Sequence, residues 1–306
     1  MTTLLFSHPA AAAHLMPPGH PEQVARHGAV LEALAGLDLQ RREAPIADDA
    51  DILRCHPRRH LDRIRAAAPD QGFHMLDGDT SMSPGSLEAA LRGVGAACAA
   101  VDAVLAGEAS SAFVAMRPPG HHAERETPMG FCLFGNVAIA AMRALDHHGL
   151  DRVAVLDFDV HHGNGTQDLL WEEKRAFFAS THQMPLYPGT GAPSETGAFG
   201  QVMNVPLAPG SGGDEAQAAW RTILDRCREF GPQLILVSAG FDAHRDDPLA
   251  QLNWDDADFA AITRLICDVA GWCGVPVVSC LEGGYDLAAL GRSVRAHVEV
   301  LMETGR

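Results

Sequence analysis

The stretch from Val153 to Thr166 constrains the fold of this chain more than any other segment. It begins with four apolar residues and ends in a Gly-rich break, with Asp159 and His161 between them. A continuous Val/Ala/Leu run bounded by turn residues predicts a strand buried on both faces of a parallel sheet. In open α/β sheets of this kind, ligands bind just beyond the carboxyl ends of the strands. We therefore expect the chemistry of the protein to lie beside this segment.

A pattern of strand, loop and helix repeats over the whole length of the chain. Further strands are predicted at 113–116, 176–180, 201–207, 233–238 and 276–280, and helices at 22–37, 51–67 with a break at Pro57, 87–105, 137–145, 167–173, 214–230, 257–271 and 287–302. Ser86 is expected to cap the helix that follows it. Because no linker interrupts this alternation, we predict an α/β fold with a single doubly wound domain over residues 1–306.

The composition argues against several classes of protein. With 39 acidic and 23 basic residues the formal net charge is −16, which disfavours a nucleic-acid partner because phosphate binding needs a basic face. No apolar run is long enough to cross a membrane, and the N-terminus has no signal-peptide pattern. Seven cysteines without a CxxC pair predict reduced thiols in a cytoplasmic protein and no cysteine zinc site.

Three polar residues beyond strand ends form a candidate metal site. Asp159 and His161 are two residues apart, so an extended chain points both side chains the same way. The pair alone is a weak signal, because a strand-end cap beside a surface histidine has the same pattern. Asp242 follows the predicted strand 233–238 and adds a third ligand at the same sheet edge. Two carboxylates and one imidazole suit a zinc-like cation, and three protein ligands leave the open position of a catalytic site.

Two further segments would supply acid–base chemistry. His121 and His122 follow a Pro-Pro-Gly turn, whose irregular backbone can bring both imidazoles to one site. Tyr285 follows two glycines, which let the backbone turn sharply. A metal in the candidate site would activate a water, and a histidine could take the proton of this water and return it to a leaving amine. The tyrosine could polarise a carbonyl. This combination predicts metal-assisted hydrolysis of an amide.

The motifs of the chain resemble those of the zinc-dependent histone deacetylase superfamily, in its class II and bacterial deacetylase-like branch. The resemblance covers nearly the whole chain, and its motifs are His20-Pro-Glu, Arg117-Pro-Pro-Gly-His-His-Ala, Gly130-Phe-Cys, Asp157-Phe-Asp-Val-His-His-Gly-Asn-Gly-Thr, Tyr187-Pro-Gly-Thr-Gly, Ser238-Ala-Gly-Phe-Asp-Ala-His and Glu282-Gly-Gly-Tyr. It implies the arginase–deacetylase fold, with an eight-stranded parallel sheet between helices. The implied reaction is removal of acetyl or related acyl groups from the ε-amine of lysine or a similar amine.

The resemblance also implies roles for individual residues. Zinc would bind Asp159, His161 and Asp242. The implied catalytic residues are His122 as general base and acid with Asn164 behind it, His121 as a charged partner oriented by Asp157, and Tyr285 as the group that polarises the carbonyl. Arg26 matches an inner-channel position only loosely, and a solvated helix charge is at least as good an interpretation of it.

Binding residues are implied in the same way. The substrate-binding positions would be Gly130, Phe131 and Tyr187 along a narrow acyl-lysine tunnel, with Leu249 and Asp79 near its rim. A monovalent cation, K⁺ or Na⁺, would bind at Asp157, Asp159, His161 and Ser180, mostly through backbone carbonyls. The expected partner is an acylated lysine or acylated amine, with no nucleic acid and no membrane.

Three alternatives stay open. An acetylpolyamine deacetylase shares the motifs, although Leu249 is apolar where some polyamine-selective members carry Glu. A ureohydrolase of the arginase type shares the fold, but it needs two manganese ions and a Gly-Gly-Asp-His loop, which this sequence does not contain. A non-catalytic acyl-lysine binding module would not need the intact histidine pair and Tyr285.

Overall fold

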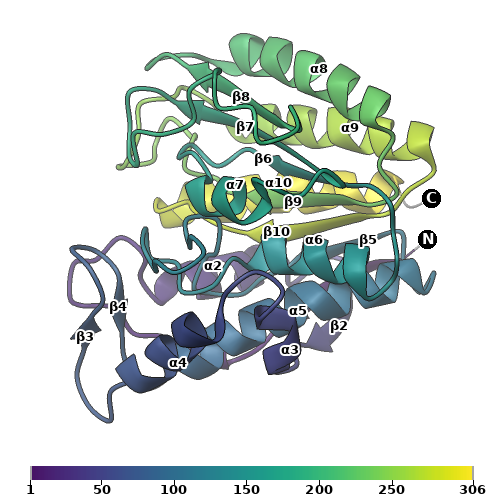
Figure 1. Ribbon diagram of the computed structural model, residues 1–306. Helices are drawn as coiled ribbons and strands as arrows, with labels where there is room; N and C mark the ends of the chain where they lie inside the picture. Colours follow the sequence, from purple (N-terminus) through teal and green to yellow (C-terminus); the bar gives the residue numbers. More distant parts are fainter. Residues whose placement is uncertain (1, 305–306) are drawn as a thin grey trace.

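The computed structural model describes residues 2–304, and its main element is one eight-stranded sheet (Figure 1). The strands of this sheet are β1 (Thr3–Ser7), β2 (Gln40–Glu43), β5 (Ser111–Val114), β6 (Val153–Asp157), β7 (Ala176–Gln183), β8 (Val202–Leu207), β9 (Ile235–Ala239) and β10 (Val277–Leu281). Their order is β2-β1-β5-β10-β9-β6-β7-β8, and every neighbouring pair is parallel. The predicted α/β fold with an eight-stranded parallel sheet is confirmed.

Helices cover both faces of the sheet. They are α1 (Ala10–Ala13), α2 (Ala25–Ala33), α3 (Asp49–Ile52), α4 (Arg58–Ala67), α5 (Ser86–Leu105), α6 (Asn136–Asp146), α7 (Asn164–Leu170), α8 (Gly213–Phe230), α9 (Asp256–Cys273) and α10 (Leu287–Thr304). Helices α3 to α7 pack on one face, and α2, α8, α9 and α10 pack on the other (Figure 1). Within residues 2–304, no helix combines the length and the apolar character that crossing a membrane requires.

Strand β6 is buried on both faces, as its apolar run predicts. Val153 and Val155 belong to the core on the α5 face, whereas Ala154 and Leu156 belong to the core on the α8 face. All four are fully buried, because side chains alternate along a strand and helices cover both sides. Burying one such Val or Leu side chain contributes roughly 1.5–3 kcal/mol relative to leaving it exposed. The strand is thereby fixed in register, and the position of the residues that follow it is fixed as well.

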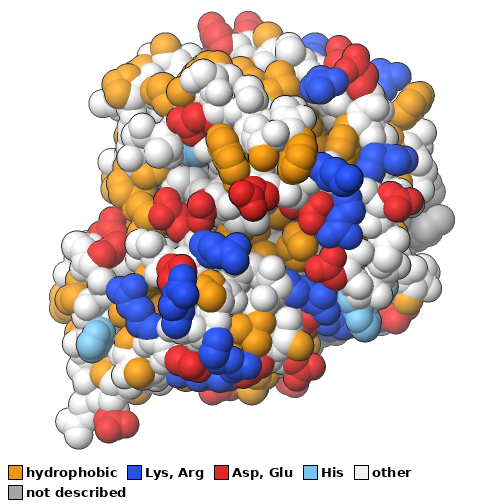
Figure 2. Space-filling model, viewed as in Figure 1, with side chains coloured by type: hydrophobic (Ala, Val, Ile, Leu, Met, Phe, Trp, Pro, Cys, Tyr) orange, Lys and Arg blue, Asp and Glu red, His pale blue; other side chains and the backbone are white. Residues whose placement is uncertain are grey.

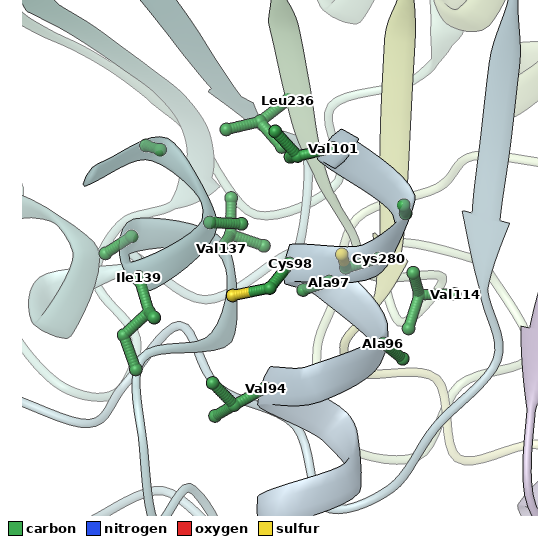
Figure 3. Packing of buried hydrophobic residues seen from close by; sticks show 14 of the residues in the cluster. Val94, Ala96, Ala97, Cys98, Val101, Val114, Val137, Ile139, Leu236 and Cys280 are labelled. Carbon is green, nitrogen blue, oxygen red and sulfur yellow. The ribbon is translucent and has the colours of Figure 1, made fainter. Parts of the chain in front are cut away.

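Helix α5 lies close to the sheet because its inner face consists of small residues. Figure 3 shows this packing, in which the labelled side chains are Val94, Ala96, Ala97, Cys98 and Val101 of α5, Val114 of β5, Val137 and Ile139 of α6, Leu236 of β9 and Cys280 of β10. At Gly95 a Cβ atom would overlap the carbonyl oxygen of Pro45. A glycine there lets the preceding loop rest directly on the helix.

Several boundaries differ from those predicted. Strands β1 and β2 were not predicted, and β2 is an edge strand of sequence Gln-Arg-Arg-Glu without apolar alternation. The helix expected from residue 22 begins at Ala25. Ser86 is the first residue of α5 instead of its cap, and its hydroxyl accepts the N–H of Ser83 at 2.7 Å. The loop before it contains a short antiparallel hairpin, β3 (His74–Met75) and β4 (Ser81–Met82).

Charged side chains of both signs are interspersed on the face shown in Figure 2. Exposed ion pairs recur along the described chain, for example between Arg245 and Asp255 at 2.6 Å and between Arg58 and Asp49 at 2.6 Å. Exposed pairs of this kind contribute at most about 1 kcal/mol each. On this face, the acidic residues are mixed with basic ones and do not gather into a single patch.

Candidate active site

The site lies at the carboxyl edge of the sheet, where the loops after β5, β6, β9 and β10 meet. These four strands are neighbours in the order β5-β10-β9-β6, and because they are parallel their carboxyl ends share one edge. The β5 loop carries His121 and His122, and the β6 loop carries Asp159 and His161. The β9 loop adds Asp242, and the β10 loop adds the Gly-Gly-Tyr segment.

Asp159, His161 and Asp242 form a buried cluster whose ligand atoms all lie within 4.8 Å of one another. The Nδ1 atom of His161 is 3.1 Å from Asp159 Oδ1 and 3.2 Å from Asp242 Oδ2. The Oδ2 atom of Asp242 is buried and makes no hydrogen bond. A buried carboxylate oxygen without a hydrogen bond is costly unless a cation meets it, so this set fits a divalent metal. One nitrogen and two carboxylate ligands are a donor set that zinc accepts.

Backbone groups hold the two carboxylates in place. The Oδ2 atom of Asp159 accepts the N–H of Gly283 at 2.8 Å, and the Oδ1 atom of Asp242 accepts the N–H of Val160 at 2.9 Å. A Cβ atom at Gly283 would overlap Asp242, and a Cβ atom at Gly240 would overlap Asp159. Glycine is required at both positions because the backbone passes directly against the ligands.

The adjacent histidines His121 and His122 have different partners. The Nδ1 atom of His121 is 3.1 Å from Asp157 Oδ2, whereas the Nδ1 atom of His122 is 2.7 Å from Asn164 Oδ1. The amide of Asn164 is oriented by Glu124, whose Oε1 accepts its Nδ2–H at 2.8 Å. The Asn164 oxygen therefore faces His122 and accepts from Nδ1–H, which leaves the lone pair of the His122 ring on Nε2.

The two histidines consequently differ in charge at neutral pH. Burial opposes a positive charge on His121, but Asp159 and Asp157 outweigh it and raise its pKa well above the usual value. Burial and the nearby charge of His121 lower the pKa of His122 well below the usual value. A charged His121 thus lies beside a neutral His122, and a neutral imidazole is the form that accepts a proton.

A pocket of about 230 Å³ joins these groups to the surface. It is lined by Asp79, His122, Gly130, Phe131, His161, Leu186, Tyr187, Leu249 and Tyr285. The structure therefore brings together all five residues that the sequence assigned to substrate binding, and it adds Leu186. Phe131 has a left-handed backbone (φ 69°) that is uncommon for a non-glycine residue, and such conformations recur at functional sites.

Aromatic rings form two walls of this pocket. Tyr187 meets His122 edge-on with a centroid distance of 5.2 Å, and Phe131 meets Tyr285 edge-on at 5.9 Å. The N–H of Phe131 donates to Thr80 Oγ1 at 3.0 Å, which fixes the unusual backbone. Flat apolar walls above a polar floor suit a slender aliphatic chain that ends in a polar group.

Comparison with known proteins identifies the family. Residues 20–301 match the family model described as the histone deacetylase domain. The chain belongs to the histone deacetylase family. Its relatives include the histone deacetylase-like amidohydrolase of Pseudomonas aeruginosa, which is 44% identical over 92% of this chain and 74% of the relative. Histone deacetylase 10, chloroplastic, of Oryza sativa is 40% identical over 90% of this chain and 68% of the relative.

A solved structure confirms the fold of this histone deacetylase family member. The HDA15 HD domain superposes with a TM-score of 0.94 at 30% sequence identity, covering 99% of this chain and 89% of the other. The predicted family and its arginase–deacetylase fold are thus confirmed.

Arg26 is not a solvated helix charge, which was one interpretation of its position in the sequence. It is fully buried, its guanidinium carbon lies 4.9 Å from the centroid of the Tyr285 ring, and it donates to the carbonyl oxygens of Gly284 at 2.5 Å and Glu282 at 2.6 Å. Its charge is balanced by Glu22 at 2.8 Å. The interpretation was wrong because α2 turns this residue toward the β10 loop instead of toward solvent.

Other buried charged residues support the histidine loop and were given no role from sequence. Glu282 accepts the N–H groups of Gly120 at 2.6 Å and His121 at 3.2 Å. Arg117 is paired with Glu22 at 2.5 Å, and both side chains are fully buried. The family motifs contain both Arg117 and Glu282, and this was the only sign in the sequence that they could have a role. Their contacts could not be predicted, because the residues they contact lie far away in the sequence.

The candidate residues for a monovalent cation also meet at the strand ends. Asp157 and Ser180 are paired across β6 and β7, and Asp159 and His161 follow directly after β6. All four residues are buried. The monovalent-cation site at these residues stays a prediction.

Proposed function

We propose that this histone deacetylase family member is a zinc-dependent deacetylase that removes acetyl or related acyl groups from the ε-amine of lysine or a similar amine. The proposal is carried by one observation: His161 of the Asp159–His161–Asp242 cluster and His122, whose pKa is lowered, line the same aromatic-walled pocket. The printed names of relatives, among them an amidohydrolase and several deacetylases, support the same reaction class.

The metal would be held by Asp159, His161 and Asp242. Zinc bound there supplies a Lewis acid that polarises the amide carbonyl and makes a water more acidic. Three protein ligands would leave room for a further ligand on the metal, and one of the three, His161, lines the pocket. A monovalent cation near Asp157 and Ser180 would stabilise the ends of β6 and β7 without contacting the substrate.

The proton transfers are assigned to His122. Its Nε2 atom takes the proton of the attacking water and later gives it to the amine that leaves, which is what a neutral imidazole can do. His121 stays protonated between Asp157 and Asp159 and contributes a fixed positive charge. Tyr285 donates a hydrogen bond to the carbonyl oxygen as negative charge develops on it. Phe131 and Tyr187 pack against the methylene chain of the amine and exclude water.

Two observations bear on the choice of amine. Leu249 lines the pocket and offers an apolar contact, which favours the methylene chain of an acyl-lysine. Asp79 lines the same pocket and could instead meet a second ammonium group, so acetylpolyamines are the alternative substrates. A panel of an acetyl-lysine peptide, acetylated polyamines and longer N-acyl lysines, compared by kcat/KM, distinguishes the two classes.

Metal content and turnover test the proposal together. The purified protein should contain one zinc per chain, in contrast to the two manganese ions of a ureohydrolase. Asp242→Ala should lose most of its zinc and its activity, because two ligands and a water do not hold the ion tightly. Asp246→Ala, which changes an exposed carboxylate on the same loop, is the control and should retain both. Full zinc occupancy and normal turnover in Asp242→Ala would remove Asp242 from the site.

A further inference from the structure

Asp247 takes no part in the chemistry described above, yet its carboxylate holds the backbone of two residues that line the pocket. The residue is 7% exposed. Its Oδ2 atom accepts the N–H of Tyr285 at 2.7 Å and that of Asp286 at 3.4 Å, while Oδ1 accepts the N–H of Leu249 at 3.0 Å. Tyr285 and Leu249 both line the pocket. One carboxylate therefore fixes the backbone of both pocket-lining residues.

The segment that carries Tyr285 needs such an anchor. Gly283 and Gly284 precede it, and Gly284 has a φ of 117°, a conformation open mainly to glycine. Two glycines give the segment little stiffness of its own, so the direction of the next side chain depends on its contacts. Arg26 holds the carbonyl of Gly284, and Asp247 holds the next polar group, the N–H of Tyr285.

The bond from Asp247 to Tyr285 is a long-range contact. The two residues are 38 positions apart, whereas the bond to Leu249 is a local turn across two positions. The local bond shapes the loop after β9, and the long-range bond ties this loop to the one after β10. Asp247 is not part of the Asp159–His161–Asp242 cluster, so its role is separate from metal binding.

We propose that Asp247 is a positioning residue for Tyr285. Its carboxylate sets the orientation of the phenol toward the substrate carbonyl and holds the backbone of Leu249, which lines the same pocket. The inference rests on the proposed function, because it takes the phenol of Tyr285 as the carbonyl-polarising group. A misplacement of about 1 Å in such a group can cost on the order of a hundredfold in rate, so a buried anchor here affects turnover.

A double-mutant cycle tests this role. Asp247→Asn keeps the shape of the side chain but replaces one acceptor oxygen by an NH₂ group. Either the N–H of Leu249 or the N–H groups of Tyr285 and Asp286 then face a donor and lose their acceptor. In the wild-type background we expect kcat on an acetyl-lysine peptide to fall about tenfold or more, with KM and zinc content little changed. In the Tyr285→Phe background the same substitution should cause no further loss, because the hydroxyl that it misplaces is already absent.

Asp246→Asn is the matched control, since it makes the same chemical change at the neighbouring, exposed position and should leave kcat unaltered. Equal losses of kcat in both backgrounds would overturn the proposal, and so would an unchanged kcat for Asp247→Asn. If Asp247→Asn does not fold, the cycle is run with Asp247→Glu, which keeps the charge but shifts the carboxylate by one methylene. A Tyr285→Phe protein with wild-type turnover would instead contradict the proposed function.

Discussion

At the scale of single residues, the division of labour between His121 and His122 follows from the group that each Nδ1 atom meets. A carboxylate stabilises a charged imidazole, whereas the neutral amide oxygen of Asn164 accepts the Nδ1–H of His122 without adding a negative charge that would favour a second proton on the ring. The two rings lie with centroids only 4.0 Å apart, so a positive charge on one also disfavours a charge on the other. This arrangement keeps one histidine charged and its neighbour ready to accept a proton.

The roles of the two histidines can be separated by substitution. His122→Ala should lose most of the rate, about a hundredfold to ten-thousandfold, because both proton transfers depend on this ring. His121→Ala should lose less, since it removes a charge beside the reaction and leaves the base in place. Both are measured as kcat at equal zinc content. A much larger loss for His121→Ala than for His122→Ala would reverse the assignment.

Tyr285→Phe isolates the phenol hydroxyl. The ring and its contacts with Arg26 and Phe131 are preserved, and only the hydrogen-bond donor is removed. We expect kcat to fall roughly a hundredfold or more, about 3 kcal/mol, as for a lost oxyanion donor. Zinc content and melting temperature should change little. A tyrosine with a purely structural role would give the opposite pattern, a lower melting temperature with nearly normal turnover.

Sequence patterns located the residues that meet at the candidate site better than the residues that support them. Asp159, His161 and Asp242 could be predicted because each follows a strand that its apolar run reveals. The buried pairing of Glu22 could not be predicted, because its partner Arg117 is 95 positions away and no local pattern links the two residues. A buried ion pair forms where two segments that are distant in the sequence come together in the fold. A single sequence does not show which segments do so.

At the scale of elements, apolar runs predicted the central strands and missed both β1 and β2. Strand β6 is covered by helices on both faces, so nearly every residue in it must be apolar. Strand β2 lies at the sheet edge, where three of its four side chains are exposed and polar residues are tolerated. Its place in the sheet comes from backbone pairing with β1, which leaves no signature in side-chain hydrophobicity.

Replacing a glycine by alanine should have opposite effects on stability in helices α5 and α2. Gly95→Ala in α5 puts a methyl group onto the carbonyl of Pro45 and should destabilise the protein by about 1–3 kcal/mol, because the backbone must shift. Gly28→Ala in α2, where nothing lies within 4 Å of the new atom, should stabilise it by about 0.5–1 kcal/mol. Urea unfolding of both variants measures the difference. Gly95→Ala with the stability of the wild type would contradict the packing of this loop on α5.

At the scale of the whole molecule, several histidines outside the Asp159–His161–Asp242 cluster are buried, and burial favours their neutral form. Burial and the neighbouring His60 lower the pKa of His56 to about 3, and burial lowers that of His297 to about 3. The Nε2 atom of His56 accepts the N–H of Gly135 at 2.9 Å, which a protonated ring could not do. Sequence alone reveals 16 histidines but does not say which of them the folded chain shields from water.

Each shielded histidine couples folding to pH with a defined sign. The unfolded chain binds a proton at His297 near pH 6.5, whereas the folded chain does so only near pH 3. Between these values the unfolded state binds more protons, so the stability that His297 contributes is lost as pH falls below about 6.5. The slope approaches about 1.4 kcal/mol per pH unit for one group. Buried acids act in the opposite direction, as at Asp157, whose pKa burial raises to about 6.

The pH-dependent contribution of His297 to stability is therefore measured by comparing a variant with the wild type. His297→Gln removes the titrating ring but can still hydrogen-bond Thr263 or Ser279, the hydroxyl partners of the histidine at 2.7 and 2.8 Å. We expect the variant to be less stable than the wild type at pH 7.5, because its packing among the surrounding phenylalanines is poorer. Between pH 6 and 4.5 its free energy of unfolding should fall less steeply, by roughly 1 kcal/mol per pH unit. The control is His147→Gln, which makes the same change at an exposed histidine. If the free energies of unfolding of His297→Gln and the wild type vary with pH in parallel, the folded protein does not exclude the proton from His297.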